Sequence, residues 1–119
     1  MLQLATLKYG SNVLEKCIKY SSPDLKTEIL DEVINKSSVD GDSPFSLMQL
    51  IRNNFANFVV QKVLDEASEE QRNKFIKKIL TVAPQIRSQN KACRHVFDHL
   101  EKKYGVRVPQ RGANNPILK

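Results

Sequence analysis

Two hexapeptides of the sequence, SNVLEK and NFVVQK, place polar side chains in the same frame. The first holds Ser11 and Glu15 four residues apart, and the second holds Asn57 and Gln61 at the same spacing. Side chains four residues apart share one face of a helix, so each pair can offer hydrogen-bond donors and acceptors to one ligand. Phe58 follows Asn57 and supplies a large ring for stacking. These residue types predict a surface that binds flat, polar groups.

The two hexapeptides belong to a longer internal repeat. The stretch GSNVLEKCI at 10–18 aligns with ANFVVQKVL at 56–64, and CRHVFDHLE at 93–101 is a weaker third copy. The spacing of the copies is typical of helical solenoids, in which stacked units bury their apolar faces against one another. A run of Ser, Asp, Gly and Pro at 36–45 predicts a loop, which explains the wider interval between the first two copies.

A longer helix is predicted after each of the first two copies. Ser22 is the expected N-cap of one helix, with Pro23 at its first position. Ser68 and Gln71 have the spacing of a capping box at the start of the other. The apolar stripes of these helices are Leu25, Ile29, Leu30, Val33 and Ile34 in one, and Phe75, Ile76, Ile79 and Leu80 in the other.

Shorter helices are expected before the three copies, at 2–7, 45–52 and 84–89, the last opening with Pro84. Each unit then has three helices, and the hexapeptide lies on the middle one. The sequence therefore predicts an all-α fold, an α-solenoid of superhelical three-helix repeats. On the middle helices, the side chains expected to point inward are Val13, Leu14, Cys17 and Ile18 in one copy, and Val59, Val60, Val63 and Leu64 in the next. Those expected on the outer face are Ser11, Asn12, Glu15, Asn57, Phe58 and Gln61.

Three stretches carry a resemblance to a known family: YGSNVLEKCI, NFANFVVQKVL and HVFDHLEKKYG. In this order, with the loop between the first two, they resemble the last two repeats and the C-terminal cap of the PUF (Pumilio and FBF) RNA-binding family. The likeness covers roughly residues 2–104. The implied organisation is the C-terminal part of the penultimate repeat at 1–36, a loop insertion at 37–44, the last repeat at 45–80, a cap pseudo-repeat at 81–104 and a flexible tail at 105–119.

In PUF repeats, residues of the middle helix read one RNA base, two on its edge and one by stacking. The resemblance implies that Ser11 and Glu15 read guanine. It implies that Asn57 and Gln61 read uracil. A carboxylate can accept both N–H groups of the guanine edge, whereas an amide can donate to the uracil carbonyls and accept from N3–H. Because RNA runs antiparallel to the protein in this family, the implied step is 5′-UG-3′, the start of a UGU element.

The resemblance also implies stacking contacts. Asn12 and Phe58 would stack, with the guanine between them, and His95 of the cap would stack under the uracil. Lys16 and Lys62 follow the reader positions, and two interpretations stay open for them, phosphate contact or plain solvation.

The cap residues allow a metal site as an alternative. Arg94, His95 and Asp98 occupy the reader positions of the third copy, but they match no base-reading combination, so no base preference is expected there. Cys93 and His99 complete a set of side-chain types that bind zinc. A helix brings His95 and His99 together, but no third ligand is well placed, so no metal is expected.

Composition excludes several classes of function. The 119 residues carry a net charge of +6, which favours an anionic partner. Cys17 and Cys93 are isolated thiols without a CxxC spacing or a secretory leader, which indicates a reducing, cytoplasmic location. No apolar run approaches membrane-spanning length. The sequence has no glycine-rich phosphate loop or nucleophile elbow, so neither an enzyme nor a cofactor is expected.

Simpler interpretations of the reader residues stay open as well. Glu15 is four residues before Lys19, which suits an ordinary surface ion pair. Asn57 and Gln61 are also compatible with plain solvation, although the adjacent Phe58 favours the reader interpretation.

Three functions are compatible with these residues. The resemblance implies binding to single-stranded RNA in mRNA 3′ untranslated regions, and repression or decay of the message through recruited corepressors or deadenylation factors. The alternatives are a protein-binding scaffold that uses its convex face and the 36–45 loop, or a helical repeat that binds nucleic acid without base preference. The chain opens near the end of a short helix, so it is expected to be a terminal piece of a longer array. Its uncovered apolar end is expected to favour self-association or exchange of loop-linked helices.

Overall fold

The structure is a computed structural model that describes residues 7–37, 39, 46–86 and 91–106. These residues form helices and their connections, and no β-strand occurs among them. The helices are α2 (Lys8–Tyr20), α3 (Pro23–Lys36), α4 (Leu47–Arg52), α5 (Ala56–Glu66), α6 (Glu69–Ile86) and α7 (Lys91–Tyr104). The all-α prediction is confirmed.

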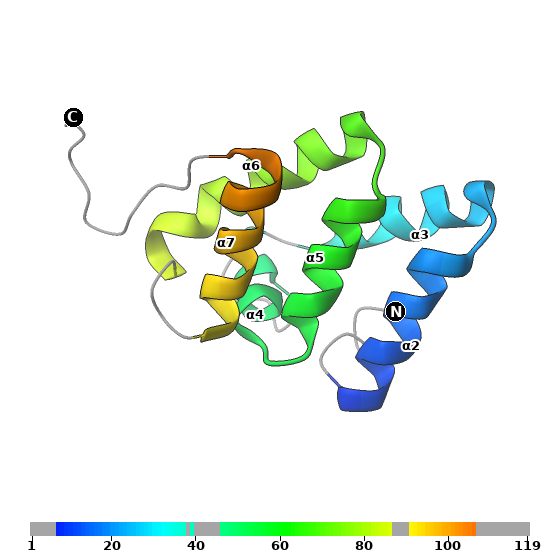
Figure 1. Cartoon of the computed structure of the whole chain (residues 1–119), viewed down its shortest axis with the longest axis horizontal. Coiled ribbons are helices and arrows are strands. Elements are labelled where there is room, and N and C mark those ends of the chain that lie inside the picture. The colour runs from blue at the N-terminus through cyan, green and yellow to red at the C-terminus, as the bar shows by residue number, and fades with distance from the viewer. Residues whose placement is uncertain (1–6, 38, 40–45, 87–90, 107–119) are drawn as a thin grey trace.

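The helices are arranged in two layers (Figure 1). The middle helices α2, α5 and α7 lie in a row, with α5 in contact with both of its neighbours. Helices α3 and α6 pack behind this row and contact each other, and the short helix α4 contacts α5, α6 and α7. This succession of similar helices is the solenoid that the repeat predicts, and it places the two hexapeptides on adjacent helices.

Both predicted helix starts are confirmed. The Ser22 hydroxyl accepts a hydrogen bond from the Leu25 N–H at 3.4 Å, and Pro23 is the first residue of α3. At the start of α6 the capping box is reciprocal. The Ser68 hydroxyl accepts from the Gln71 N–H at 3.2 Å, and the Gln71 side chain accepts from the Ser68 N–H at 3.1 Å. Each bond satisfies a backbone N–H that has no partner within the helix.

One continuous apolar core joins all the helices. The largest fully buried side chains are Phe75, Phe97, Leu14, Ile18, Leu30, Ile34, Leu47, Leu50, Ile51, Leu64, Ile79 and Ile86. Burial of this much apolar surface is what fixes the row of middle helices against the outer pair.

Three side chains that were expected to point inward are exposed. Val13 is 54% exposed, Leu25 is 48% exposed and Cys17 is exposed, so the prediction is wrong for them. The counterparts of Val13 and Cys17 in the next repeat, Val59 and Val63, are buried. The difference arises because α5 has a middle helix on either side, whereas α2 has one on one side only within the described part of the chain (Figure 1).

The prediction that a new helix opens at Pro84 is also wrong. Helix α6 continues through Pro84 to Ile86. Proline in the last turn removes one backbone hydrogen bond. Val82, Ala83 and Ile86 are buried around it, and their packing holds the last turn in helical form.

The outer helices α3 and α6 are joined by polar side chains. Gln71 donates to Asp31 at 2.8 Å, and Lys74 donates to Asn35 at 2.7 Å. Lys78 donates to the Ser37 carbonyl at 2.8 Å, near the end of α3. Burial, together with the nearby charge of Lys74, lowers the pKa of Lys78. These contacts fix the outer layer that supports the middle helices.

Several predictions concern residues outside the described ranges. The short helix expected at 2–7 lies there apart from Leu7, and so do positions 38 and 40–45 of the 36–45 loop. Of the tail expected at 105–119, Gly105 and Val106 are described. Gly105 has a positive φ of 64°, which favours glycine, and the Val106 N–H donates to the Leu100 carbonyl at 3.1 Å to close the end of α7.

Candidate functional site

Helix α5 presents an aromatic ring to solvent, as the sequence predicts. Phe58 is 46% exposed. The helix begins after a turn in which the Asn53 side chain accepts hydrogen bonds from the Phe55 and Ala56 N–H groups, at 2.8 and 2.9 Å. This turn fixes the rotation of α5, so that Val59 and Val60 are buried and Phe58 faces outward.

Asn57 is buried, with 1% of its surface exposed, so the prediction that it lies on the outer face is wrong. Its side-chain nitrogen donates to the Asn53 and Asn54 carbonyls at 2.8 and 3.0 Å. Its side-chain oxygen accepts from Gln61 Nε2 at 3.2 Å. The physical reason for burial is that this amide satisfies two carbonyls of the α4–α5 connection. Gln61, half-buried, is the amide that remains at the surface.

Ser11 of α2 is buried in the same way, at 3% exposed, and the prediction that it faces out is wrong as well. Its hydroxyl donates to the Lys8 carbonyl at 3.0 Å, within the first turn of α2. Asn12 is exposed and Glu15 is half-buried, as their outer positions predict. In both repeats the first reader position is therefore tied to its own helix start, and the second is at the surface.

Glu15 and Lys62 form an electrostatic pair across the α2–α5 contact. Burial raises the pKa of Glu15, and the Lys62 charge partly offsets this rise. Glu15 and Lys19, both described, form no ion pair, and the Lys19 ammonium lies 5.4 Å from the centre of the Tyr20 ring. The ordinary Glu15–Lys19 pair is therefore not the role of this carboxylate in the structure.

Lys16 and Lys62 occupy equivalent positions of the two hexapeptides but different surroundings. Lys62 lies within electrostatic reach of Glu15 on the neighbouring helix. Lys16 instead lines an open, mostly apolar groove of about 360 Å³ on α2, together with Val13, Cys17, Tyr20 and Ser21. Their equivalent positions in the sequence therefore do not give the two lysines equivalent environments.

A pocket of about 250 Å³ opens between α5 and α7. Helix α5 contributes Phe58 and Gln61, and α7 contributes His95, Asp98, His99, Lys102 and Lys103. The rings of Phe58 and His95 lie 6.1 Å apart, centre to centre, with their planes inclined by 45°. The pocket thus combines exposed rings, an amide and cationic side chains, which are the groups that stack on bases and attract phosphates.

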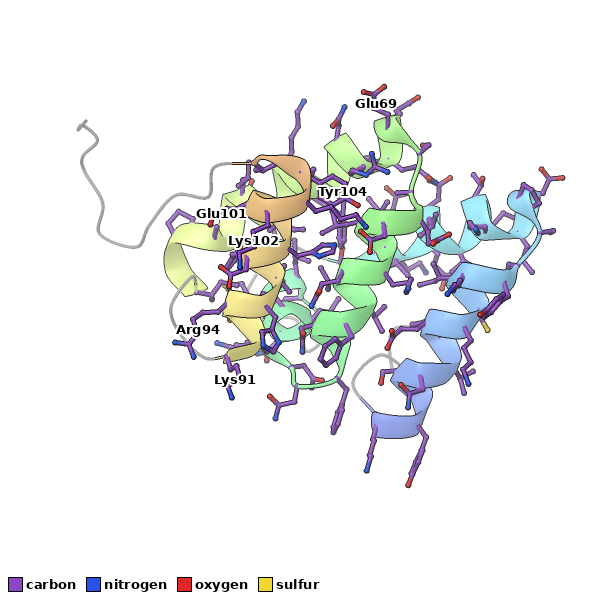
Figure 2. All side chains as sticks on the ribbon, viewed as in Figure 1. Glu69, Lys91, Arg94, Glu101, Lys102 and Tyr104 are labelled. Atoms are coloured by element: carbon purple, nitrogen blue, oxygen red, sulfur yellow. The ribbon has the colours of Figure 1, made fainter. Side chains whose placement is uncertain are left out.

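Sequence reasoning missed the cluster around Asp65, at one end of this pocket. One oxygen of the Asp65 carboxylate accepts from Tyr104 Oη at 2.6 Å, His99 Nε2 at 2.8 Å and Lys103 Nζ at 3.0 Å. Figure 2 shows Tyr104 between α7 and α5, where the cluster joins the two helices. The available signal was that Asp65 follows Gln61 by four residues and so shares its face of α5.

The protonation equilibria of this cluster are shifted. Burial alone would raise the pKa of Asp65, but the hydrogen bonds from Tyr104, His99 and Lys103 outweigh it and lower the pKa. Burial and the hydrogen bond to Asp65 raise the pKa of Tyr104 to about 12. Both shifts favour the charged carboxylate and the neutral phenol at neutral pH.

Arg72 of α6 contacts the same cluster through the ring of Tyr104. Its guanidinium lies 4.9 Å from the centre of the Tyr104 ring. It also donates to the Leu64 carbonyl at 2.8 Å and the Ala67 carbonyl at 2.9 Å, which caps the end of α5. The end of α5, the start of α6 and the end of α7 are thus connected through one arginine.

Two further observations concern the described residues alone. No group of three or more His, Cys, Asp or Glu side chains gathers among them as a metal ion would require. None of their helices combines the length and the apolar composition needed to cross a membrane.

Comparison with known proteins agrees with this arrangement. The family model of the PUF, or Pumilio-family RNA binding repeat, matches residues 1–34 and 46–80, more than half of the chain. The chain belongs to the PUF family. The two matched segments carry the two hexapeptides, and the interval between them contains the whole 36–45 loop of this PUF chain.

Two curated relatives illustrate the similarity. A Pumilio domain-containing protein of Schizosaccharomyces pombe is 33% identical over 102 residues, which cover 85% of this chain and 14% of that protein. The mRNA-binding protein PUF3 of Saccharomyces cerevisiae is 35% identical over 68 residues, which cover 53% of this chain and 8% of PUF3. The PUF chain therefore spans only a small part of the relatives that it matches.

A solved structure shows the same fold. The crystal structure of PUF-8 in complex with PBE-RNA matches with a TM-score of 0.70 and 31% sequence identity. The match covers 87% of this chain and 29% of the PUF-8 chain. The row of middle helices is thus the architecture of a PUF protein that was crystallised with RNA.

Proposed function

We propose that this PUF chain binds single-stranded RNA along the row of α2, α5 and α7, as part of a longer array of repeats. The observation that carries the proposal is the exposed Phe58 ring beside Gln61, at the mouth of the pocket between α5 and α7. A large ring in solvent is unfavourable unless a ligand covers it, and nucleobases stack on such rings. The membership of the family and the RNA complex of PUF-8 support the same ligand class.

Gln61 is the side chain best placed to read a uracil edge. One N–H of its amide is engaged by Asn57, which leaves its oxygen and its second N–H for a ligand. These groups complement N3–H and a carbonyl of uracil. The hydrogen bond to Asn57 fixes the orientation of Gln61. Asn57 itself can contact the uracil edge only after the Gln61 N–H releases the Asn57 side-chain oxygen.

Glu15 is the corresponding reader of guanine on α2. Its carboxylate accepts both N–H groups of the guanine edge when it is ionised, and the Lys62 charge favours the ionised form. Ser11 donates its hydroxyl hydrogen to Lys8, so only its lone pairs are left to accept from a base. With antiparallel RNA, the two readers select a 5′-UG-3′ step of a UGU element.

Stacking supplies the rest of the binding free energy. Asn12 and Phe58 lie next to the readers and stack on either side of the guanine, at roughly 1–3 kcal/mol per base for an aromatic contact. His95 stacks under the uracil, which requires its ring to rotate from the 45° inclination to Phe58. Lys62 reaches a phosphate only at the expense of its interaction with Glu15, and Lys16 does so from the far side of α2.

The biological role that follows is regulation of messenger RNA in the cytoplasm. Binding to a 3′ untranslated region would bring repression or decay through protein partners such as corepressors or deadenylation factors. The 36–45 loop is the proposed docking segment for them, with the domain boundaries 1–36, 45–80 and 81–104 as the units of the array.

Base-resolved titration tests the proposal. Short RNAs with UG, UA or CG steps are titrated against the chain and against its Glu15→Ala and Gln61→Ala variants, with Glu28→Ala on α3 as the control. We expect tightest binding to UG, loss of guanine preference in Glu15→Ala and loss of uracil preference in Gln61→Ala. Equal weakening on all three RNAs would indicate nonspecific binding, and no binding to any RNA would contradict the proposal.

A further inference from the structure

Asp65 joins α5 to the cap helix α7 at one end of the pocket that holds the exposed rings. Phe58, Gln61 and Asp65 follow one another at helical spacing along one face of α5. His95, His99 and Lys103, four residues apart, form the facing stripe of α7. Asp65 therefore faces the last turns of α7, while Phe58 faces its first turn.

The two ends of the pocket are held very differently. At the Asp65 end, three donors of α7 converge on one carboxylate oxygen, and the side chains of Asp65 and His99 are only 22% and 20% exposed. Hydrogen bonds to a charged group that is shielded from water are the stronger ones. At the other end, the buried Cys93, Val96 and Phe97 of α7 pack into the apolar core, and at the surface the rings of Phe58 and His95 approach each other at a tilt. Apolar packing is less directional than hydrogen bonds to a charged group. The position of the exposed His95 relative to Phe58 therefore depends also on how α7 is held at its far end.

Tyr104 makes the Asp65 end rigid rather than merely polar. Its hydroxyl donates to Asp65, and its ring contacts the Arg72 guanidinium, which itself donates to the Leu64 and Ala67 carbonyls at the end of α5. The His99 and Tyr104 rings meet edge to face, with centres 5.8 Å apart. A single carboxylate therefore fixes three side chains of α7 and connects them to the end of α5.

We propose that Asp65 is a positioning residue for RNA binding: by holding the end of α7 it sets the gap between His95 and Phe58 in which a base stacks. The inference rests on the proposed function. It assigns Asp65 no contact with RNA, because its carboxylate is engaged by Tyr104, His99 and Lys103.

The test uses the Asp65→Asn variant of the full chain, with Glu66→Gln as the matched control. Glu66 is the next residue of α5, and its ion pair with Lys26 at 2.8 Å joins α3, away from the pocket. The first readout is the NMR spectrum of the His95 imidazole, whose resonances are displaced by the ring current of Phe58. We expect these resonances to move in Asp65→Asn and to stay unchanged in Glu66→Gln.

The second readout is affinity for an RNA with the UG step. Asp65→Asn is expected to weaken binding about tenfold, as for loss of a hydrogen bond to a charged group. The double variant Asp65→Asn with His95→Ala should lose no more affinity than the single variant that loses more, because both changes act on the same stacking gap. Tyr104→Phe, which removes one of the three bonds and keeps the ring, should show a smaller effect of the same kind and serves if Asp65→Asn does not fold.

Two outcomes overturn the inference. One is additive loss of affinity in the double variant, which means that Asp65 acts independently of His95. The other is unchanged His95 resonances in folded Asp65→Asn. If the unmodified chain binds no RNA, the proposed function fails, and the His95 resonances alone then decide whether Asp65 positions α7.

Discussion

At the scale of single residues, the ionisation of Glu15 depends on a lysine of the neighbouring repeat. Lys62→Met should raise the pKa of Glu15 further, because burial then acts without the opposing charge. The side-chain carboxyl chemical shift of Glu15, followed by NMR against pH, measures this directly. With a raised folded pKa, the contribution of Glu15 to stability is fully present below its ordinary pKa of 4.5 and is lost as pH rises through the folded value.

The matched control is Lys16→Met. Lys16 has the same place in its hexapeptide but lines the groove on the other side of α2, so its loss should leave the Glu15 titration unchanged. Equal shifts in both variants would contradict the pairing of Glu15 with Lys62. The proposed guanine preference should weaken in Lys62→Met at pH values where Glu15 is partly protonated.

At the scale of helices, the starts of α3 and α6 contribute stability that local sequence already predicts. Ser68→Ala should lower the free energy of unfolding by about 1 kcal/mol, because the Gln71 N–H loses its acceptor and half of the capping box is removed. Urea denaturation followed by circular dichroism measures the change. Asn73→Ala, an exposed position further along α6, is the control and should not destabilise the chain.

The helix starts and the end of α6 differ in how far the sequence predicts them. The caps at Ser22 and Ser68 were predicted because each bond joins residues three apart in the chain. The continuation of α6 through Pro84 was not, because burial of the neighbouring side chains decides it and a local helix-start signal does not report burial. Helical periodicity identified the apolar face of α2, but periodicity carries no information on whether another helix covers that face.

In the candidate site, too, features set by helical spacing were predicted and features set by tertiary contacts were not. Exposure of Phe58 and Asn12 follows from helical spacing and was predicted. Burial of Asn57 was not, because it depends on the bonds of its side chain to the Asn53 and Asn54 carbonyls of the α4–α5 connection. The Asp65 cluster was missed because its partners His99 and Tyr104 lie 34 and 39 residues away in the chain.

At the scale of the whole molecule, helix α7 is attached to α5 in part through a phenol, that of Tyr104, with a raised pKa. Below pH 10.0, the ordinary pKa of tyrosine, the contribution of Tyr104 to stability is fully present, and it is lost as pH rises through the folded value of about 12. Tyr104→Phe should therefore lose stability at neutral pH and show a shallower decline above pH 10.0. Urea denaturation across this range, compared with the exposed Tyr20→Phe control, measures the difference. A decline as steep in Tyr104→Phe as in the unmodified chain would contradict it.

The exposed groove of α2 makes self-association a prediction for the isolated chain. Val13 and Tyr20, at 54% and 73% exposed, line it together with Cys17. Val13→Asn should reduce any dimer seen by sedimentation velocity, because it places an amide in the apolar contact. Val39→Asn, at an exposed valine outside the groove, is the control. A dimer population insensitive to Val13→Asn would place the contact elsewhere.

The internal bonds of Asn57 also bear on how this protein can change over evolutionary time. A mutation there removes both donors to the backbone before α5, so a lineage that shifts its ligand preference at this position must first tolerate a weakened helix start. Ser11 has a single such bond, so substitutions at this position should destabilise the helix start less. If the proposed RNA contacts hold, new target motifs should therefore arise sooner through the α2 repeat than through the α5 repeat.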